Sequence, residues 1–141
     1  MMSRLIICMF LFISVTASAQ DIFGKWKTID DKTGEAKSIV EIYKRDGQVY
    51  GKIVHIIDPT KREELCTKCE GEAKNKPVLG FELIKNMKKS GKYYKSGTIF
   101  DPENGKEYKC RLLVTEDPNV LQVRGYISFL YATQYWKRVV E

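Results

Sequence analysis

Histidine is almost absent from this chain, and so are the serine motifs of common hydrolases. His55 is the single histidine among 141 residues, and no serine lies within a Gly-x-Ser-x-Gly segment. A Ser-His-Asp hydrolase needs an imidazole base beside its nucleophile, so the sequence argues against that class of enzyme. His55 alternates with Ile53 and Ile57, which is typical of a half-buried structural residue in a strand. We therefore predict no catalytic residue and no cofactor.

Long apolar runs are also scarce. The run Leu5–Val15 covers only about half the length of a membrane-crossing helix. It follows the positive charge of Arg4 and precedes the small residues Ala17-Ser18-Ala19, a pattern that predicts a secretory signal peptide cleaved after Ala19. We expect export through the Sec route to the periplasm or beyond, a signal peptide over residues 1–19, a single domain over residues 20–141, and no stable membrane anchor.

Cysteine is limited to four residues, and Cys8 lies within the predicted signal peptide. Cys66, Cys69 and Cys110 remain, and an oxidising compartment favours one disulfide and one leftover thiol. A bridge between Cys66 and Cys69 closes a very short ring. A bridge from either of them to Cys110 closes a loop of about 40 residues and contributes about 3–4 kcal/mol in the chain-entropy model. The sequence leaves this choice open.

The Cys-x-x-Cys pair has two other interpretations. Redox-active pairs usually lie at a helix N-terminus, which lowers the pKa of one thiol, but Glu70-Gly71-Glu72 follows here with negative charge and no clear helix. Zinc would find a complete Cys₃His set in the three cysteines and His55, although the ligands lie far apart in sequence and Cys110 belongs to an apolar face. We predict a structural disulfide and no bound metal.

The chain carries a net charge of +6, with most basic residues spread among acids. The densest basic group surrounds a glycine turn, and we interpret it as a solvated surface. The alternative is that it contacts an anionic lipid or polysaccharide. Nothing resembling a helix-turn-helix, a zinc finger or an aromatic-rich RNA-binding motif accompanies it, so we expect no nucleic-acid partner. This group consists of Lys85, Lys88, Lys89, Lys92 and Lys95.

The rest of the sequence predicts strands, because turn signals recur at intervals of roughly eight to fifteen residues and no long stretch has a clean helical period. Phe81–Met87 fits either a short helix or a strand. Asp58–Lys76 is a long polar loop, a type of segment that is often functional or mobile. The expected strands are Gly24–Asp30, Ala36–Tyr43, Gln48–Ile57, Lys92–Phe100, Glu107–Thr115, Val120–Tyr126 and Ala132–Val139.

Side-chain alternation supports these strands. Tyr108, Cys110, Leu112 and Val114 share one face of their segment, as expected for a half-buried strand. Seven or eight antiparallel strands in a chain of this size must close into a barrel or pack as a sandwich to hide their edges. We predict an all-β antiparallel fold with a short helix or loop insertion.

Several segments resemble known families. Gly24-Lys25-Trp26 resembles the opening motif of lipocalins, and this resemblance implies that Trp26 closes one barrel end against Arg138. The chain as a whole is similar to the exported bacterial family DUF2147, which implies a lipocalin-like up-and-down barrel of about eight strands and no assigned catalytic residue. The matching segments are Gly24-Lys25-Trp26, Gly51-Lys52-Ile53, Lys76-Pro77-Val78-Leu79-Gly80, Gly97-Thr98-Ile99-Phe100-Asp101-Pro102, Gly105-Lys106-Glu107-Tyr108, Leu121-Gln122-Val123-Arg124-Gly125 and Thr133-Gln134-Tyr135-Trp136.

The candidate ligand site lies on the last two predicted strands. If Arg124, Gln134 and Trp136 point inward, with Tyr126 near them, a guanidinium, an amide and an indole would hold an anionic or otherwise amphipathic ligand. The alternative is a buried Arg124 that pairs with a carboxylate or stacks on tryptophan as a structural plug.

Three functions remain open at this point. The preferred one is non-catalytic binding of a small apolar or amphipathic ligand. The second is a structural or interaction protein of the cell envelope with a filled barrel, and the third is a redox or zinc-binding protein. An interior cavity of a few hundred Å³ would favour the first over the second.

Overall fold

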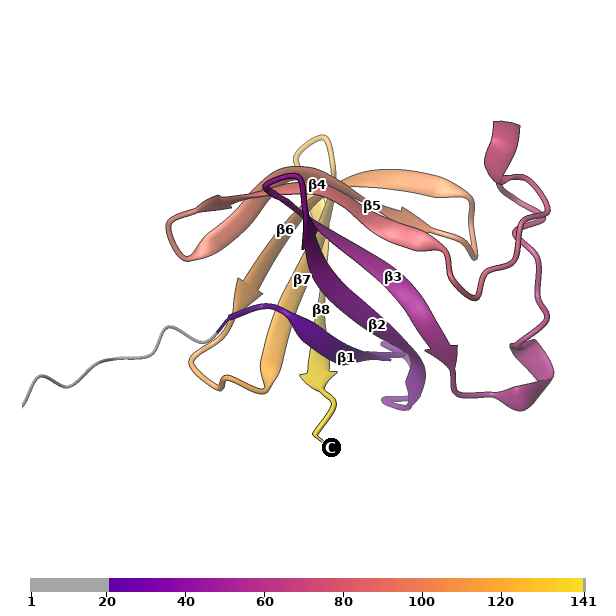
Figure 1. The fold of residues 1–141 in the computed structure, drawn as a ribbon, viewed down its shortest axis with the longest axis horizontal. Helices are drawn as coiled ribbons and strands as arrows, with labels where there is room; N and C mark the ends of the chain where they lie inside the picture. The colour runs from indigo at the N-terminus through magenta and orange to yellow at the C-terminus, as the bar shows by residue number, and fades with distance from the viewer. Residues whose placement is uncertain (1–20, 141) are drawn as a thin grey trace, which may run out of the picture.

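The computed structural model describes residues 21–140 (Figure 1). Eight strands follow one another around a closed antiparallel barrel, and the last strand returns to the first. The predicted up-and-down barrel is thereby confirmed. The predicted signal peptide, residues 1–19, lies outside the described residues. The strands are β1 (Gly24–Ile29), β2 (Ala36–Arg45), β3 (Gln48–Ile56), β4 (Glu82–Ser90), β5 (Tyr93–Asp101), β6 (Lys106–Val114), β7 (Val120–Ile127) and β8 (Leu130–Arg138).

The predicted insertion is the connection between β3 and β4, which projects from the barrel in Figure 1. It contains two single-turn 3₁₀ helices, η1 (Pro59–Lys61) and η2 (Gly71–Ala73). Asp58 caps η1 by accepting a hydrogen bond from the backbone N–H of Thr60. Within residues 21–140 the structure has no helix with the length and apolar character needed to cross a bilayer.

The ambiguous segment Phe81–Met87 is a strand. Leu83, Ile84 and Met87 are all buried, a spacing that mimics one face of a helix. Two register shifts against β3 cause it: one lies at Leu83, and the other lies between Ile84 and Met87, where Asn86 has a backbone φ of 59°. A local irregularity in the strand therefore produced the helical pattern.

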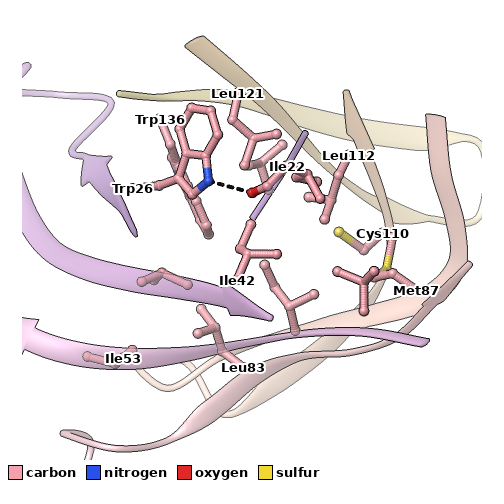
Figure 2. Packing of buried hydrophobic residues seen from close by; sticks show 14 of the residues in the cluster. Ile22, Trp26, Ile42, Ile53, Leu83, Met87, Cys110, Leu112, Leu121 and Trp136 are labelled. Carbon is pink, nitrogen blue, oxygen red and sulfur yellow. Dashed lines mark hydrogen bonds between the residues drawn. The ribbon is translucent and has the colours of Figure 1, made fainter. Parts of the chain in front are cut away.

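Buried side chains fill the interior of the barrel, from Ile22 and Trp26 where β1 begins to Ile56 and Leu83 beside the β3–β4 connection (Figure 2). Trp26 and Trp136 are the largest of these residues, and Ile22, from the segment before β1, packs among them. Interiors of small barrels are commonly filled by side chains in this way. The labelled members of this core are Ile22, Trp26, Ile42, Ile53, Leu83, Met87, Cys110, Leu112, Leu121 and Trp136.

The two ends of the barrel differ. We call the end with the start of β1 and the end of β8 the closed end. The opposite end, the mouth, is bordered by the β1–β2 turn, the β3–β4 connection, the β5–β6 turn and the β7–β8 turn, because loops after odd-numbered strands all lie on one side of an up-and-down barrel. Side chains on the inner wall are more exposed at the mouth than at the closed end.

Candidate functional site

Trp26 and Arg138 meet at the closed end. The two residues are paired across β1 and β8, and the Arg138 guanidinium lies 4.2 Å from the centre of the Trp26 ring. The indole is fully buried and its Nε1 donates to the carbonyl oxygen of Ile22 at 2.9 Å. A cation over an indole face gains electrostatic energy, and the buried N–H has its partner, so neither polar group of this pair is left without an interaction.

Arg138 also ties the segment before β1 to the barrel. Its guanidinium donates to the carbonyl oxygens of Phe23 at 3.1 Å, Asp21 at 2.9 Å and Pro118 at 3.2 Å. These bonds hold Ile22 in place as an apolar plug (Figure 2). This role of Ile22 was not predicted from the sequence, although an apolar pair, Ile22-Phe23, directly precedes the Gly24-Lys25-Trp26 motif.

The four residues predicted to bind ligand lie on two faces of the sheet. Cα pairing of Leu121 with Trp136 and of Val123 with Gln134 places Gln134 and Trp136 on the inner face. Arg124 pairs with Thr133 and Tyr126 pairs with Tyr131, so these residues face outward. The guanidinium of Arg124 therefore does not converge with the amide of Gln134 and the indole of Trp136.

Each group of residues has its own partners. Trp136 Nε1 donates to Oε1 of Gln134 at 3.1 Å, and Nε2 of Gln134 donates to Oδ2 of Asp31 at 3.1 Å. Arg124 Nε donates to the Thr133 hydroxyl at 2.9 Å, and its guanidinium lies 4.4 Å from the centre of the Tyr131 ring. Arg124 is thus neither a pocket residue nor the partner of a buried carboxylate, and it forms part of a surface.

The inner wall is partly exposed at the mouth. Ala132 is exposed, although its Cα pairing with Gly125 places it on the inner face. A Cβ added to Gly125 would meet Tyr108 at 3.5 Å and Ile99 at 3.7 Å, so these two side chains border the same space. Tyr108, Ile99 and Gln134 are all only partly buried. Ile99 and Val123 still belong to or contact the core at this level, whereas Ala132 on the same inner face is left exposed.

An ion pair crosses the mouth. The Lys37 ammonium of β2 contacts the Glu103 carboxylate in the β5–β6 turn, and it lies 3.7 Å from Oδ2 of Asp30. Hydrogen bonding and attraction to Glu103 raise the pKa of Lys37, against the opposing effect of its burial. Because both partners are substantially exposed, such a pair contributes only about 0–1 kcal/mol and is easily opened.

Two surface hollows of the described chain are open depressions outside the barrel. One lies at the closed end beside Gly24, Tyr43 and Val139, and the other lies between η2 and the start of β4 beside Pro77 and Phe81. Neither is lined by Arg124, Gln134 or Trp136. They place no enclosed ligand cavity at the predicted site.

The disulfide joins Cys66 to Cys69, with their Cα atoms 5.3 Å apart, and Cys110 is a free, buried thiol. The short ring is therefore the one that forms, and the 40-residue loop does not. Burial raises the pKa of Cys110 to about 12, so this thiol stays protonated and unreactive. Residues 21–140 contain no group of three or more potential metal ligands, so the Cys₃His set is not assembled there.

The disulfide segment packs against the β5–β6 turn. Gly105 has a φ of 71°, and a Cβ there would lie 2.0 Å from the carbonyl oxygen of Lys68. Both cysteines are buried, and the Cys66 N–H donates to the carbonyl oxygen of Lys76 at 2.8 Å. The bridge thus holds a surface segment on the mouth of the barrel.

His55 is exposed rather than half-buried, so the expectation for that side chain was wrong.

A polar cluster on β2 and β4 could not be predicted from the sequence, because its members are far apart in the chain. The Tyr43 hydroxyl donates to the Glu82 carboxylate, which also accepts two bonds from the Arg45 guanidinium at 3.0 and 3.2 Å. Burial and the bond to Glu82 raise the pKa of Tyr43 to about 12. Burial alone would raise the pKa of Glu82, but the bonds from Tyr43 and Arg45 lower it.

This fold and this pattern of sealed end and open mouth define a lipocalin-like barrel. The chain belongs to the family described as an uncharacterized protein conserved in bacteria (DUF2147), whose model matches residues 24–138. The structure is similar to that of HP1028, a Helicobacter pylori protein described as belonging to the lipocalin family, with a TM-score of 0.76 and 19% identity over 87% of this chain and 86% of that chain. None of the curated proteins compared matches the chain.

Proposed function

We propose that the protein binds a small apolar or amphipathic ligand at the mouth of its barrel, without catalysing a reaction. The exposure of Ala132 on the inner wall is the observation that carries this proposal, because apolar wall left uncovered in a barrel is a natural binding surface. Membership of a family with a lipocalin-like barrel is compatible with it. The ligand would contact a shallow wall, since Trp26 and Trp136 fill the space below.

The mouth offers chemistry for both parts of an amphipathic molecule. Ile99 and the Cβ of Ala132 present apolar surface, and the Gln134 amide and the Tyr108 hydroxyl can hydrogen-bond a polar head. The Lys37–Glu103 ion pair lies across the entry, and its low stability lets it open for a ligand. Gln134 remains a ligand-site residue in this proposal, Trp136 lies in the packed core below it, and Arg124 and Tyr126 belong to the outer wall.

A retained ligand and a competition assay test this proposal. Native mass spectrometry of protein purified from its own host should reveal a bound small molecule, and a fluorescent fatty acid should bind and be displaced by it. Substitution A132W should fill the mouth and abolish probe binding with little change in Tm. The matched control Y135W enlarges an exposed residue on the outer face of the same strand and should leave binding unchanged.

A second function is favoured by the packed interior. A structural or interaction protein of the cell envelope needs a stable scaffold and no internal cavity, and the core around Trp26 fits that need. Absence of any retained molecule, together with equal probe behaviour of A132W and the unmodified protein, would support this function and contradict ligand binding at the mouth.

We also propose that the protein works in an oxidising compartment, the periplasm or the exterior. The Cys66–Cys69 disulfide is consistent with this location, because such bonds persist in exported proteins and are rare in the cytosol.

A further inference from the structure

The hairpin formed by β7 and β8 exposes a concentrated apolar tip. Its turn consists of Ser128 and Phe129, and Ile127 pairs with Leu130 directly below it. Phe129 is 85% exposed, more than any other large hydrophobic residue of the described chain, and Ile127, Leu130 and Tyr131 are also more than half exposed. Large apolar side chains grouped at one exposed point indicate a contact surface rather than a folding requirement.

Basic residues form a row across the outer wall, from β4 and β5 to β7 of this hairpin. Lys88 pairs with Lys95 across β4 and β5, and Arg111 pairs with Arg124 across β6 and β7. Like charges placed directly opposite each other in a sheet destabilise it. The ion pairs seen within residues 21–140 involve none of these four side chains. The wall thus gathers positive charge that the protein itself does not neutralise.

Tyrosine rings, rather than carboxylates, contact three of these cations. The Arg111 guanidinium lies 4.5 Å from the centre of the Tyr93 ring, and the Lys95 ammonium lies 5.2 Å from it. Arg124 lies over Tyr131 in the same way. An arginine over an aromatic ring is oriented but keeps part of its guanidinium available, so the wall presents prearranged cations to an anion.

Apolar tip, tyrosines and cations follow one another along the hairpin. Phe129 and Leu130 form the tip, and Tyr126 and Tyr131 pair one step below it. Lys109 of β6 lies beside Tyr126 at the same level, and Arg124 follows two residues further from the tip. The carboxylate on the outer face nearby is Glu107, two residues from Lys109 on β6. Proteins bound to a membrane surface show the same order: apolar residues enter the acyl region, tyrosines lie at headgroup level and basic residues lie at the phosphates.

We propose that this hairpin docks the protein on an anionic lipid bilayer, with Phe129 and Leu130 inserted among the acyl chains and Arg124 and Lys109 at the lipid phosphates. The inference rests on outward-facing residues of the hairpin and not on ligand binding at the mouth, although the β7–β8 turn also borders the mouth. A second copy of the chain is a poorer occupant, because joining two such tips would bring their cations together. An anionic polysaccharide would use the cations but would leave Phe129 and Leu130 in water.

Vesicle co-sedimentation with the purified protein tests this docking. The protein should bind vesicles made of equal parts phosphatidylglycerol and phosphatidylcholine, bind phosphatidylcholine alone far less, and lose affinity as salt is raised. The double variant F129S/L130S should weaken binding about tenfold or more, because the tip can no longer bury apolar area. R124Q should weaken binding to the anionic vesicles about fivefold and leave the weak binding to phosphatidylcholine unchanged.

Val140 provides the matched control, since it is another strongly exposed apolar residue, outside the hairpin and just after β8. V140S should bind like the unmodified protein, and all variants should keep its Tm, because the changed side chains are exposed or, for Arg124, lie on the outer face. In a second measurement, brominated lipid should quench a tryptophan introduced by F129W. It should leave the buried Trp26 and Trp136 unquenched.

Three results would overturn the proposal. Equal binding of F129S/L130S and the unmodified protein to anionic vesicles would show that the tip does not insert. Concentration-dependent self-association that F129S/L130S abolishes, without vesicle binding, would assign the tip to a second copy. Binding to heparin that R124Q weakens and F129S/L130S does not, again without vesicle binding, would assign the wall to an anionic polysaccharide.

Discussion

At the scale of single residues, Arg138 and Trp26 link the last strand of the barrel to the first. Arg138 uses its fixed fork of N–H groups on three backbone carbonyls and stacks on Trp26, so no carboxylate is needed to hold it. A lysine could not reproduce this arrangement, because its ammonium is a single point of charge without a planar face. This contact between the first and last strands therefore depends on the identity of both side chains.

Trp26 gives the first prediction. W26A removes a fully buried indole from the core and should lower the free energy of unfolding by about 3–5 kcal/mol in urea denaturation. Y135A, which truncates an exposed ring on β8, should lower it by less than about 1 kcal/mol. A similarly small loss in W26A would contradict the role of Trp26 in closing the barrel.

The Tyr43–Glu82 hydrogen bond gives a prediction for pH. The pKa of Tyr43 is about 12 in the fold against an ordinary value of 10.0, so the fold binds this proton more tightly than the unfolded chain does. The resulting stabilisation is complete below about pH 10 and is lost as the pH rises toward 12. The difference in free energy of unfolding between the unmodified protein and Y43F should therefore shrink over that interval.

Urea denaturation at intervals of pH measures this effect. The lowered pKa of Glu82 acts at the other extreme, where its stabilisation is present above the ordinary carboxyl pKa and is lost as the pH falls below it. A constant difference between the unmodified protein and Y43F above pH 10 would mean that Tyr43 does not hold its proton through Glu82.

At the scale of elements, Gly97 sets the distance between β4 and β5. A Cβ at this position would lie 2.1 Å from the carbonyl oxygen of Lys85 and 2.5 Å from the sulfur of Met87. The neighbouring strand can approach this closely only because residue 97 has no side chain. The positive φ of Asn86 lies at the same crossing, so one irregularity in β4 and one glycine in β5 fit together.

Gly97 and Gly125 form a matched pair for testing this contact, because both are paired with Cys110 from opposite sides. G97A should destabilise the protein by at least about 2 kcal/mol, since backbone atoms must move apart. G125A meets only ordinary van der Waals distances of 3.5 Å or more and should cost less than about 1 kcal/mol. Equal losses in thermal unfolding would contradict the close approach at Gly97.

Most elements follow from the sequence because alternation and turn residues act locally. Leu121 and Val123 share one face of β7, which places Arg124 on the other, so the sequence already contained the signal for its outward position. The alternation of β4 did not reveal the strand, because Asn86 interrupts it. The Ile22 plug and the Tyr43–Glu82 pair could not be predicted, since they join segments that only the closed barrel brings together.

At the scale of the whole molecule, the cysteines give a prediction that combines processing and redox state. Mature protein from the periplasmic fraction should begin at Gln20 and carry one free thiol, Cys110, beside the Cys66–Cys69 bridge. Because Cys110 is buried with a raised pKa, iodoacetamide should label it only after denaturation. Intact Met1, three free thiols, or one metal ion per chain in mass analysis would each contradict part of this prediction.

The seam between β1 and β8 also affects how the chain can fold. Arg138 bonds to the carbonyl oxygen of Phe23, 115 residues earlier, and the strands share only the Cα pairs Trp26–Arg138 and Lys27–Lys137. Contacts this distant in sequence form late and slow the search for the native state, because the chain must close a very long loop. A nascent chain lacking its last strand leaves one edge of β1 and one edge of β7 unpaired, although β1 still pairs with β2 and β7 with β6. The barrel therefore gains its full stability only when nearly the whole polypeptide is free to fold.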